Sequence, residues 1–168
     1  MLVFDASTLI LLAKTDLLDL FLDHLDDKAF ITEKVEEECC RKPQAFDSLI
    51  IQKVIEEKRI TVRALRSRSV YQKLQKDLGL GSGEGETLAF ALTQKAALVA
   101  IDDRKGIRAC KLLKLPFSTA IDIVVRMRQK QILAKQEAPR KLEALARHGR
   151  YSEEIIKRAM AILEGEQQ

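Results

Sequence analysis

Short apolar runs alternate along the chain with longer stretches in which apolar positions recur every three or four residues. Runs of three to five apolar residues are typical of buried strands, and the longer period is typical of amphipathic helices. The pattern predicts strands over residues 2–4, 29–31, 60–62 and 97–101. It predicts helices over residues 7–13, 15–25, 32–40, 44–58 and 64–77, and another after a flexible glycine loop at 79–85. This alternation favours an α/β fold in three layers (α/β/α) with a central parallel sheet.

The pattern changes after Pro116. Residues 118–130, 136–148 and 152–164 are each predicted to form an amphipathic helix, with no strand between them. We therefore expect an α/β domain over residues 1–117 and a C-terminal helical extension over residues 118–168 that packs on it. The extension begins with more apolar residues than one surface helix needs, which indicates burial against the domain or against a second subunit.

The composition is that of an ordinary globular domain. Its informative feature is that acidic and basic residues are unevenly distributed along the chain. The chain has 168 residues, of which 46% are hydrophobic and 5% aromatic, and a formal net charge of +4. Residues 1–40 contain 3 basic and 10 acidic side chains, whereas residues 41–115 contain 16 and 8. The excess of basic charge is therefore regional.

The cysteines and the N-terminus bear on where the protein works. Three cysteines, two of them adjacent, match neither a disulfide framework nor a zinc motif, which favours a reducing cytoplasm. No basic region precedes the first apolar stretch, and no apolar run approaches the roughly 18 residues that span a bilayer. We expect a cytoplasmic protein with no signal peptide and no membrane association.

Acidic residues follow the most apolar predicted strands. Asp5 comes directly after residues 2–4, and Asp102 comes directly after residues 97–101. Ligands of open parallel sheets bind at the carboxyl ends of the strands, so these two carboxylates meet if their strands are neighbours. Glu38 and Glu86 lie on the helices that follow residues 29–31 and the glycine loop, so both can reach the same edge.

Four clustered carboxylates repel one another unless a cation lies between them. Such a set of oxygen ligands favours a hard divalent ion, Mg²⁺ or Mn²⁺, and the two isolated histidines argue against zinc. A divalent ion can activate water and neutralise the charge that develops on a phosphoryl group. The expected chemistry is therefore hydrolysis of a phosphodiester bond.

Spacing alone leaves alternatives open for each acid. Asp5 can serve only as a helix cap, and Asp102 and Asp103 can simply begin the next helix. Glu38 ends a run of three glutamates that has the composition of a solvated helix face. Glu84, in the glycine loop, and Glu86, in the first turn of the helix that follows, are similarly ambiguous. Only the arrangement of all the acids along the chain favours a metal site over these separate structural roles.

Four segments together resemble the PIN domain, the nuclease fold of VapC-type toxins. They are VFDASTLILLAK, ITEKVEEE, GLGSGEGETLAFAL and LVAIDDRKGIRA, and they occur in the expected order. The resemblance covers residues 1 to about 117 and is closest to the small archaeal and bacterial PIN-like proteins. It implies the α/β/α fold, Mg²⁺ or Mn²⁺ as the cofactor, and a ribonuclease that hydrolyses RNA.

The resemblance also assigns roles to individual residues. It implies that the catalytic and metal-binding acids are Asp5, Glu38, Glu86 and Asp102, with Asp103 as an additional outer ligand. Val35, three residues earlier, selects Glu38 from its run, and the small and apolar residues that follow Glu86 select it over Glu84. Ser7 matches the hydroxyl residue that supports the site.

Partners follow from the same resemblance. It implies an RNA substrate, a small antitoxin protein if the chain is the toxin of a toxin–antitoxin pair, and a homodimer; a role in RNA processing stays equally open. Basic residues near the acids are candidates for holding the RNA backbone. They are Arg63, Arg66, Arg68, Lys73 and Arg104, although a solvated helix face has the same composition.

Three other functions fit parts of the pattern. A haloacid-dehalogenase-like phosphatase needs a second Asp two residues after the first, where this chain has Ser7. A response-regulator receiver needs an acidic pair at the end of its first strand, and Asp5 has no acidic neighbour. A non-catalytic PIN-like scaffold that binds RNA or protein remains the alternative to the nuclease.

Overall fold

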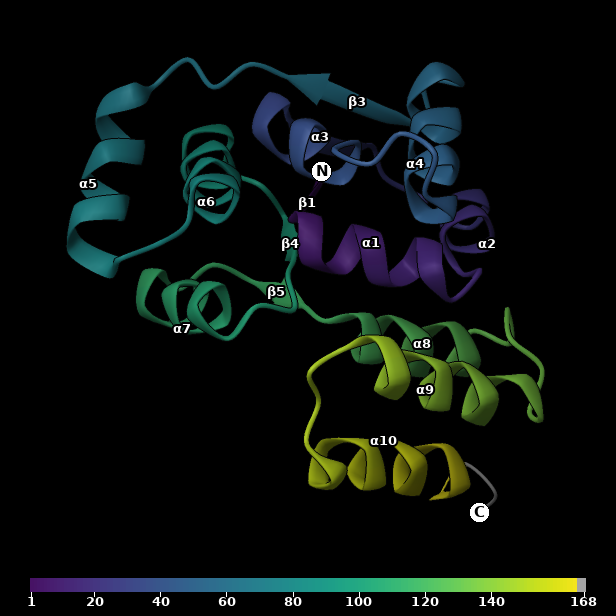
Figure 1. The fold of residues 1–168 in the computed structure, drawn as a ribbon. Helices are drawn as coiled ribbons and strands as arrows, with labels where there is room; N and C mark the ends of the chain where they lie inside the picture. Colours follow the sequence, from purple (N-terminus) through teal and green to yellow (C-terminus); the bar gives the residue numbers. More distant parts are fainter. Residues whose placement is uncertain (166–168) are drawn as a thin grey trace.

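The computed structural model describes residues 1–165, and its centre is a parallel sheet of five strands in the order β3-β2-β1-β4-β5 (Figure 1). The strands are β1 (Leu2–Phe4), β2 (Ala29–Thr32), β3 (Ile60–Arg63), β4 (Leu98–Ala100) and β5 (Phe117–Ser118). The helices are α1 (Ala6–Lys14), α2 (Leu18–Asp23), α3 (Glu33–Cys39), α4 (Phe46–Glu56), α5 (Arg68–Leu78), α6 (Ser82–Gln94), α7 (Arg104–Leu113), α8 (Ala120–Gln129), α9 (Glu137–His148) and α10 (Glu153–Gly165). The predicted three-layer α/β/α fold with a parallel sheet is confirmed.

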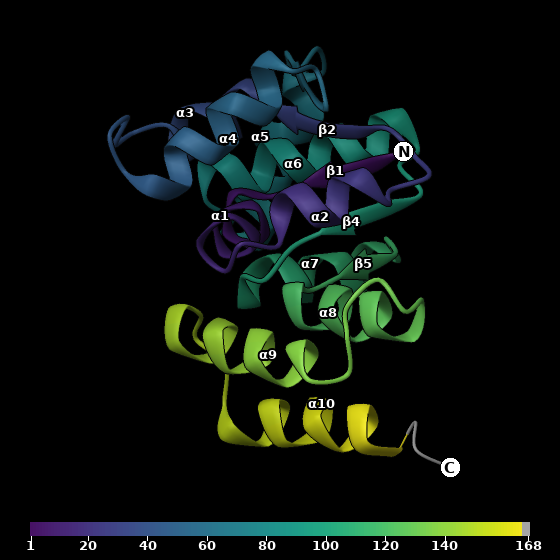
Figure 2. The ribbon, with the colours of Figure 1, turned by 90° about the vertical axis from the view of Figure 1, so that its right-hand side faces the viewer.

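Alternation along the strands divides the core into two clusters, one on each face of the sheet. In β1, Leu2 and Phe4 pack in the larger cluster with α1 and α2, and Val3 packs in the smaller cluster with α6 and α7. Figures 1 and 2 show the helices on the two sides of the strands. Because every side chain of β1 is buried, an uninterrupted apolar run is the sequence pattern this central strand requires.

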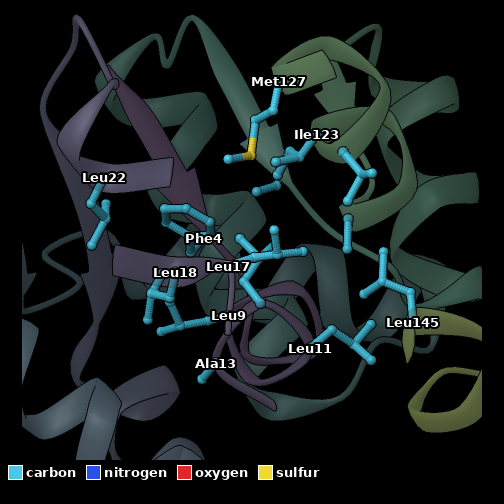
Figure 3. Close-up of a cluster of buried hydrophobic side chains, with 14 of the residues drawn as sticks. Phe4, Leu9, Leu11, Ala13, Leu17, Leu18, Leu22, Ile123, Met127 and Leu145 are labelled. Carbon is cyan, nitrogen blue, oxygen red and sulfur yellow. The ribbon is translucent and has the colours of Figure 1, made fainter. Parts of the chain in front are cut away.

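The helices after β5 share the larger cluster with the N-terminal part of the chain. Ile123 and Met127 of α8 and Leu145 of α9 belong to the same cluster as Phe4 and Leu11 (Figure 3). Burying each such side chain stabilises the fold by roughly 1.5–3 kcal/mol. Residues 118–165 are therefore part of the main core, and residues 166–168 of the predicted extension lie outside the described part of the chain.

Three details of the predicted elements are wrong. The strand β5 lies where the sequence predicts the start of a helix, at residue 118. It was missed because a strand of two residues is too short to show alternation. The predicted loop over 79–85 ends early: α6 begins at Ser82, and Gly83 and Gly85 lie inside it. The predicted helix over 15–25 is shorter, because Thr15 caps the end of α1 and α2 begins only at Leu18.

The order of the strands creates a switch point between β1 and β4. From β1 the chain builds β2 and β3 on one side, and then crosses to build β4 and β5 on the other. β1 and β4 pair directly, with Phe4 opposite Ala100, which confirms that the strands before Asp5 and Asp102 are neighbours. Ligands of open α/β sheets bind at such a switch point, outside the carboxyl ends of the strands.

In the part of the chain that is described, no helix is both long and apolar enough to cross a membrane.

Candidate active site

Asp5 and Asp102, at the ends of the two neighbouring strands, are joined through one hydroxyl. Asp5 caps α1: its Oδ2 accepts hydrogen bonds from the backbone N–H of Ser7 at 3.0 Å and from the Ser7 hydroxyl at 2.5 Å. The same Ser7 oxygen accepts a hydrogen bond from the backbone N–H of Asp102 at 3.0 Å. Ser7, the residue expected to support the site, thus fixes the start of α1 against the end of β4.

The carboxylate of Asp5 is buried, with 3% of the residue exposed. Burial raises its pKa from 3.8 to about 6, although the two hydrogen bonds from Ser7 oppose this rise. The negative charge of Glu38 raises the pKa further. An ionised Asp5 is therefore costly in the protein alone, and a bound cation would relieve that cost.

Glu38 reaches the site from α3, which begins at the end of β2. The hydroxyl of Thr32 caps this helix by accepting from the N–H of Val35 at 3.4 Å. Glu38 Oε1 accepts a hydrogen bond from the hydroxyl of Ser82 on α6 at 3.3 Å. A Cβ atom at Gly83 would lie only 2.8 Å from Glu38 Cδ, so the glycine makes room for the carboxylate.

Glu84, not Glu86, lies with the other acids. Burial raises the pKa of Glu84, and the negative charges of Asp103 and Asp5 raise it further, so its carboxylate is near both. The N–H of Gly81 donates to Glu84 Oε2 at 3.0 Å. Glu86 is two residues further along the helix, about 200° around its axis, so it points away from Glu84. Within residues 1–165, Glu86 forms no side-chain hydrogen bond or ion pair.

Asp103 and Asp102 point to different neighbours. Asp103 caps α7, accepting from the N–H groups of Lys105 at 2.6 Å and Gly106 at 3.2 Å, and lies beside Glu84. Asp102 Oδ2 accepts from the hydroxyl of Thr8 at 2.6 Å and from the N–H of Ala120 at 2.9 Å. The hydroxyl of Tyr151 donates to its Oδ1. Asp102 therefore connects the sheet to the C-terminal helices.

Burial raises the pKa of Asp102, and its three hydrogen bonds oppose this rise. Two of the donors, Thr8 and Tyr151, were not among the predicted site residues. Thr8 has a signal in the sequence, since it follows Ser7 in the first turn of α1. Tyr151 has none, because it is 49 residues from Asp102 along the chain.

The residues brought together are carboxylates from four different segments of the chain. They are Asp5, Glu38, Glu84 and Asp103, which we call the acid cluster. Oxygen ligands of this kind suit a hard cation such as Mg²⁺ or Mn²⁺. Thr87, one turn after Glu84 on α6, has the buried hydroxyl that lacks a hydrogen-bond partner among the described residues.

The chemistry of the acid cluster fits a cation, but its side chains are not arranged as a coordination shell. Among residues 1–165, no three His, Cys, Asp or Glu side chains lie close enough together to hold a metal ion. Binding of an ion at the acid cluster therefore requires these carboxylates to move towards one another.

The predicted basic residues fall into two groups. Arg104 is the first residue of α7 and directly follows Asp103. Arg63 ends β3, with its guanidinium carbon 5.9 Å from the centre of the Phe30 ring. The others, Arg66, Arg68 and Lys73, are exposed on α5 and on the loop before it. Only Arg104 adjoins the acid cluster along the chain.

The fold and the site define an α/β/α protein with a buried aspartate and neighbouring, partly exposed acids at the switch point of a parallel sheet. A sequence model described as a PIN domain matches residues 1–164, and the chain belongs to this family. PIN domains are generally nucleases and typically use divalent metal ions. Comparison with curated proteins found no match, and comparison with solved structures found none.

Proposed function

We propose that this PIN-domain protein is a Mg²⁺- or Mn²⁺-dependent endoribonuclease. The observation that carries the proposal is the acid cluster, in which Glu38, Glu84 and Asp103 come from three other segments of the chain to the neighbourhood of the buried Asp5, at the switch point of the sheet. The proposed acids differ from the predicted set in two places. Glu84 takes the place of Glu86, and Asp103, predicted as an additional outer ligand, takes the role predicted for Asp102.

The residues have distinct proposed roles. Asp5, Glu38, Glu84 and Asp103 would hold the ion. A bound divalent ion would neutralise charge on the phosphoryl group and make a water molecule more acidic. Ser7 orients Asp5 by two hydrogen bonds and keeps it ionisable. Asp102, satisfied by its own donors, fixes the end of β4 and so positions Asp103.

Cleavage of a labelled RNA of mixed sequence tests the proposal. We expect cleavage with Mg²⁺ or Mn²⁺, none with EDTA, and a loss of at least about 100-fold in the Asp5→Asn variant. Glu33→Gln is the matched control, since Glu33 is an exposed acid in the first turn of α3. Cleavage that persists in EDTA or in Asp5→Asn would show that the activity comes from elsewhere.

A role as a VapC-type toxin is a further part of the proposal, supported by membership of the PIN-domain family. It requires a small antitoxin protein as partner. Growth arrest on expression of the wild-type chain, and not of Asp5→Asn, would support the toxin over an RNA-processing enzyme. The free cysteines Cys39, Cys40 and Cys110 fit the reducing cytoplasm in which either would act.

The proposed homodimer rests on α10 and not on the start of the extension. The apolar residues that motivated it, such as Ile121, Ile123 and Val124, are buried within the chain itself. Ile155 and Ile162 of α10 are 46% and 49% exposed and are one candidate surface. A monomer in analytical ultracentrifugation at micromolar concentration would contradict the dimer.

One observation favours the non-catalytic scaffold as a second candidate. The described carboxylates are not close enough together to hold a metal ion as they stand. A scaffold would bind RNA or protein equally well with and without Mn²⁺, and Asp5→Asn would not change that binding. Metal-dependent cleavage would exclude it.

A further inference from the structure

A cavity of ≈ 280 Å³ lies at the end of the sheet opposite to the acid cluster. Its lining includes Leu2 and Leu98, the first residues of β1 and β4, whereas Asp5 and Asp102 follow the last residues of these strands. At about 3.3 Å per residue, Leu2 and Asp5 are separated by about 10 Å along β1. We propose that this cavity binds a small molecule with an apolar body and a single carboxylate, at a site separate from the acids.

The lining of the cavity is mainly apolar. Its large apolar side chains come from α2, α8, the loop after α8 and the two strands, and they are Leu2, Phe21, Leu98, Ile123, Met127 and Ile132. Leu2, Ile123 and Met127 are almost completely buried. An apolar cavity holds water poorly and accepts apolar groups. Met127 adds a flexible side chain that can adapt to the shape of an occupant.

The size of the cavity limits what it can bind. Its volume is close to the lower limit of sites for small molecules, which is about 300 Å³. A short aliphatic chain or a single aromatic ring fits such a space, whereas a folded partner or a polynucleotide does not.

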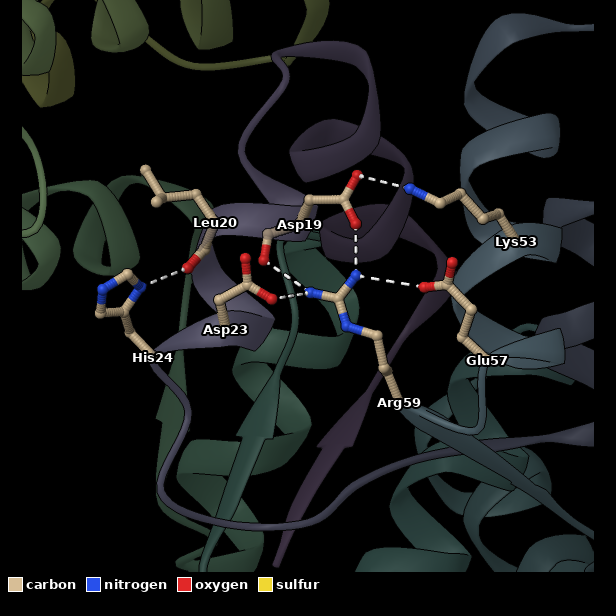
Figure 4. A network of polar contacts seen from close by, with 7 residues as sticks. All are labelled: Asp19, Leu20, Asp23, His24, Lys53, Glu57 and Arg59. Carbon is tan, nitrogen blue, oxygen red and sulfur yellow. Dashed lines mark hydrogen bonds and ion pairs between the residues drawn. The ribbon is translucent and has the colours of Figure 1, made fainter.

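The wall that α2 contributes is held in place by residues that do not line the cavity (Figure 4). Arg59 is bonded to the carboxylates of Asp19 and Asp23, and it donates to the backbone carbonyl of Asp19 at 2.8 Å. His24, which belongs to the lining, donates from Nδ1 to the carbonyl oxygen of Leu20 at 2.9 Å. Because these bonds already fix the wall, a ligand does not have to order it, which favours affinity.

The charged lining residues of the cavity are Asp26, Asp27, Arg126 and Lys130. Lys130 Nζ lies 3.6 Å from Asp26 Oδ2, and Asp27 forms an ion pair with the amino group of Met1. Arg126 forms no ion pair or side-chain hydrogen bond with any residue that the structure describes. Its guanidinium is therefore available to an anion.

The acid one turn before Arg126 on α8 is bonded elsewhere. Asp122 Oδ2 accepts from the N–H of Thr119 at 2.9 Å and from the Thr119 hydroxyl at 2.7 Å, at the cap of the helix. A guanidinium binds a carboxylate through two parallel hydrogen bonds. One unpaired guanidinium beside an apolar cavity therefore favours a monocarboxylate over an amine or a neutral molecule.

The test measures binding of octanoate to the whole protein by NMR of the methionine methyl groups, with octylamine and octanol as probes of equal chain length and different charge. The chain has 3 methionines: Met1 and Met127 line the cavity, and Met160 of α10 does not. The test variant is Arg126→Gln, and the matched control is Arg140→Gln, at an exposed arginine of α9 outside the lining. Thermal unfolding of both variants checks that they fold.

We expect octanoate to shift the methyl signals of Met1 and Met127 until binding saturates and to leave Met160 unchanged. Octylamine and octanol should bind the wild type at least about 10-fold more weakly, and octanoate should bind Arg126→Gln more weakly by the same factor, because each lacks one partner of the charged pair. Arg140→Gln should bind octanoate as the wild type does.

Three results would overturn the proposal: no saturable shift of Met1 and Met127, equal binding of the three probes, or equal binding of octanoate by the wild type and Arg126→Gln. The proposed function can fail without changing the outcome, because the test involves neither RNA nor a metal ion.

Discussion

Tyr151 donates its hydroxyl hydrogen to Asp102 Oδ1, and this bond joins the loop after α9 to the end of β4. Burial and the charge of Asp102 both raise the pKa of Tyr151, so the hydroxyl stays protonated and remains a donor. Asp102 also accepts from Thr8 of α1 and from Ala120 of α8. One carboxylate therefore connects the sheet, the first helix and the C-terminal helices.

Replacement of Tyr151 by Phe should destabilise the protein by about 1–3 kcal/mol, because a partly buried carboxylate loses a charge-assisted hydrogen bond. Urea unfolding measures the free energy. Tyr71→Phe is the control, since the Tyr71 hydroxyl forms no hydrogen bond in the described chain. Equal losses in the two variants would show that the Tyr151 bond contributes nothing of its own.

Substitution of the two glutamates of α6, one at a time, should change RNA cleavage to very different extents. Glu84→Gln removes a carboxylate that lies beside Asp103 and Asp5, so we expect metal-dependent RNA cleavage to fall by at least about 100-fold. Glu86→Gln should change it by less than about 3-fold, because Glu86 points to another side of the helix. The reverse result would restore Glu86 as the third acid of the site.

The sequence predicted the features that depend on local patterns. The strands before Asp5 and Asp102 are short apolar runs, and Thr32 begins α3, so the parallel sheet and the positions of these acids followed from the sequence. The proposal of Glu84 in place of Glu86 could not be reached from such local patterns. The predicted loop put Glu84 outside the helix, whereas α6 begins at Ser82 and turns Glu84 towards Asp103.

Contacts between segments that are far apart along the chain could not be predicted from the sequence. The bond between Tyr151 and Asp102 depends on how α8 and α9 pack on α1, and no periodicity encodes that packing. The strand β5 was missed because two residues, Phe117 and Ser118, are too few to show a pattern. The basic residues Lys14 and Arg150 were not predicted to lie near Asp102 and Asp103, because they belong to segments that are distant along the chain and meet only in the fold.

Gly83→Ala should impair catalysis while leaving the fold intact. The added methyl group would lie 2.8 Å from Glu38 Cδ, so the Glu38 side chain must move. A displacement of about 1 Å in a catalytic group can cost on the order of 100-fold in rate. Alanine also stabilises a helix relative to glycine by about 1 kcal/mol, so thermal stability should not fall much.

Gly85→Ala is the matched control for this change. Its Cβ atom would lie 3.0 Å from Tyr71 Cε2 and 3.3 Å from Gln75 Cγ, on α5 and away from Glu38. It gains the same helix propensity, and we expect cleavage within about 3-fold of the wild type. Similar losses of activity in the two variants would separate the effect from Glu38.

Leu145→Ala should destabilise the whole protein by about 2–5 kcal/mol, because this fully buried side chain of α9 lies in the cluster that contains Phe4. Circular dichroism during urea unfolding should show a single transition at lower urea. Ile162→Ala, at a residue 49% exposed on α10, should cost less than about 1 kcal/mol. Two separate transitions would show instead that the C-terminal helices unfold as an independent unit.

Removal of the charge on Asp5 should stabilise the protein when no metal is bound. Burial raises the pKa of Asp5 from 3.8 to about 6, so between these values the folded protein keeps a proton that the unfolded chain has lost. The free energy of unfolding therefore falls as the pH rises from about 4 to about 6. Above that range the wild type bears a penalty on the order of 1–3 kcal/mol, which Asp5→Asn lacks.

The variant keeps the structural role of Asp5, since the Asn amide oxygen can accept the same bonds from Ser7 and Asn caps helices as well as Asp does. Urea unfolding in EDTA at about pH 4 and about pH 7 measures the difference, which should appear only at the higher pH. Asp77→Asn, at an exposed acid with no ion pair in the described chain, should show no such gain.

Mn²⁺ should then stabilise the wild type and not Asp5→Asn, because the cation offsets the unfavourable burial of a charge that only the carboxylate has. If Asp5→Asn is less stable than the wild type at about pH 7 in EDTA, the ionised Asp5 stabilises the fold, and the prediction that its charge is unfavourable without a metal is wrong.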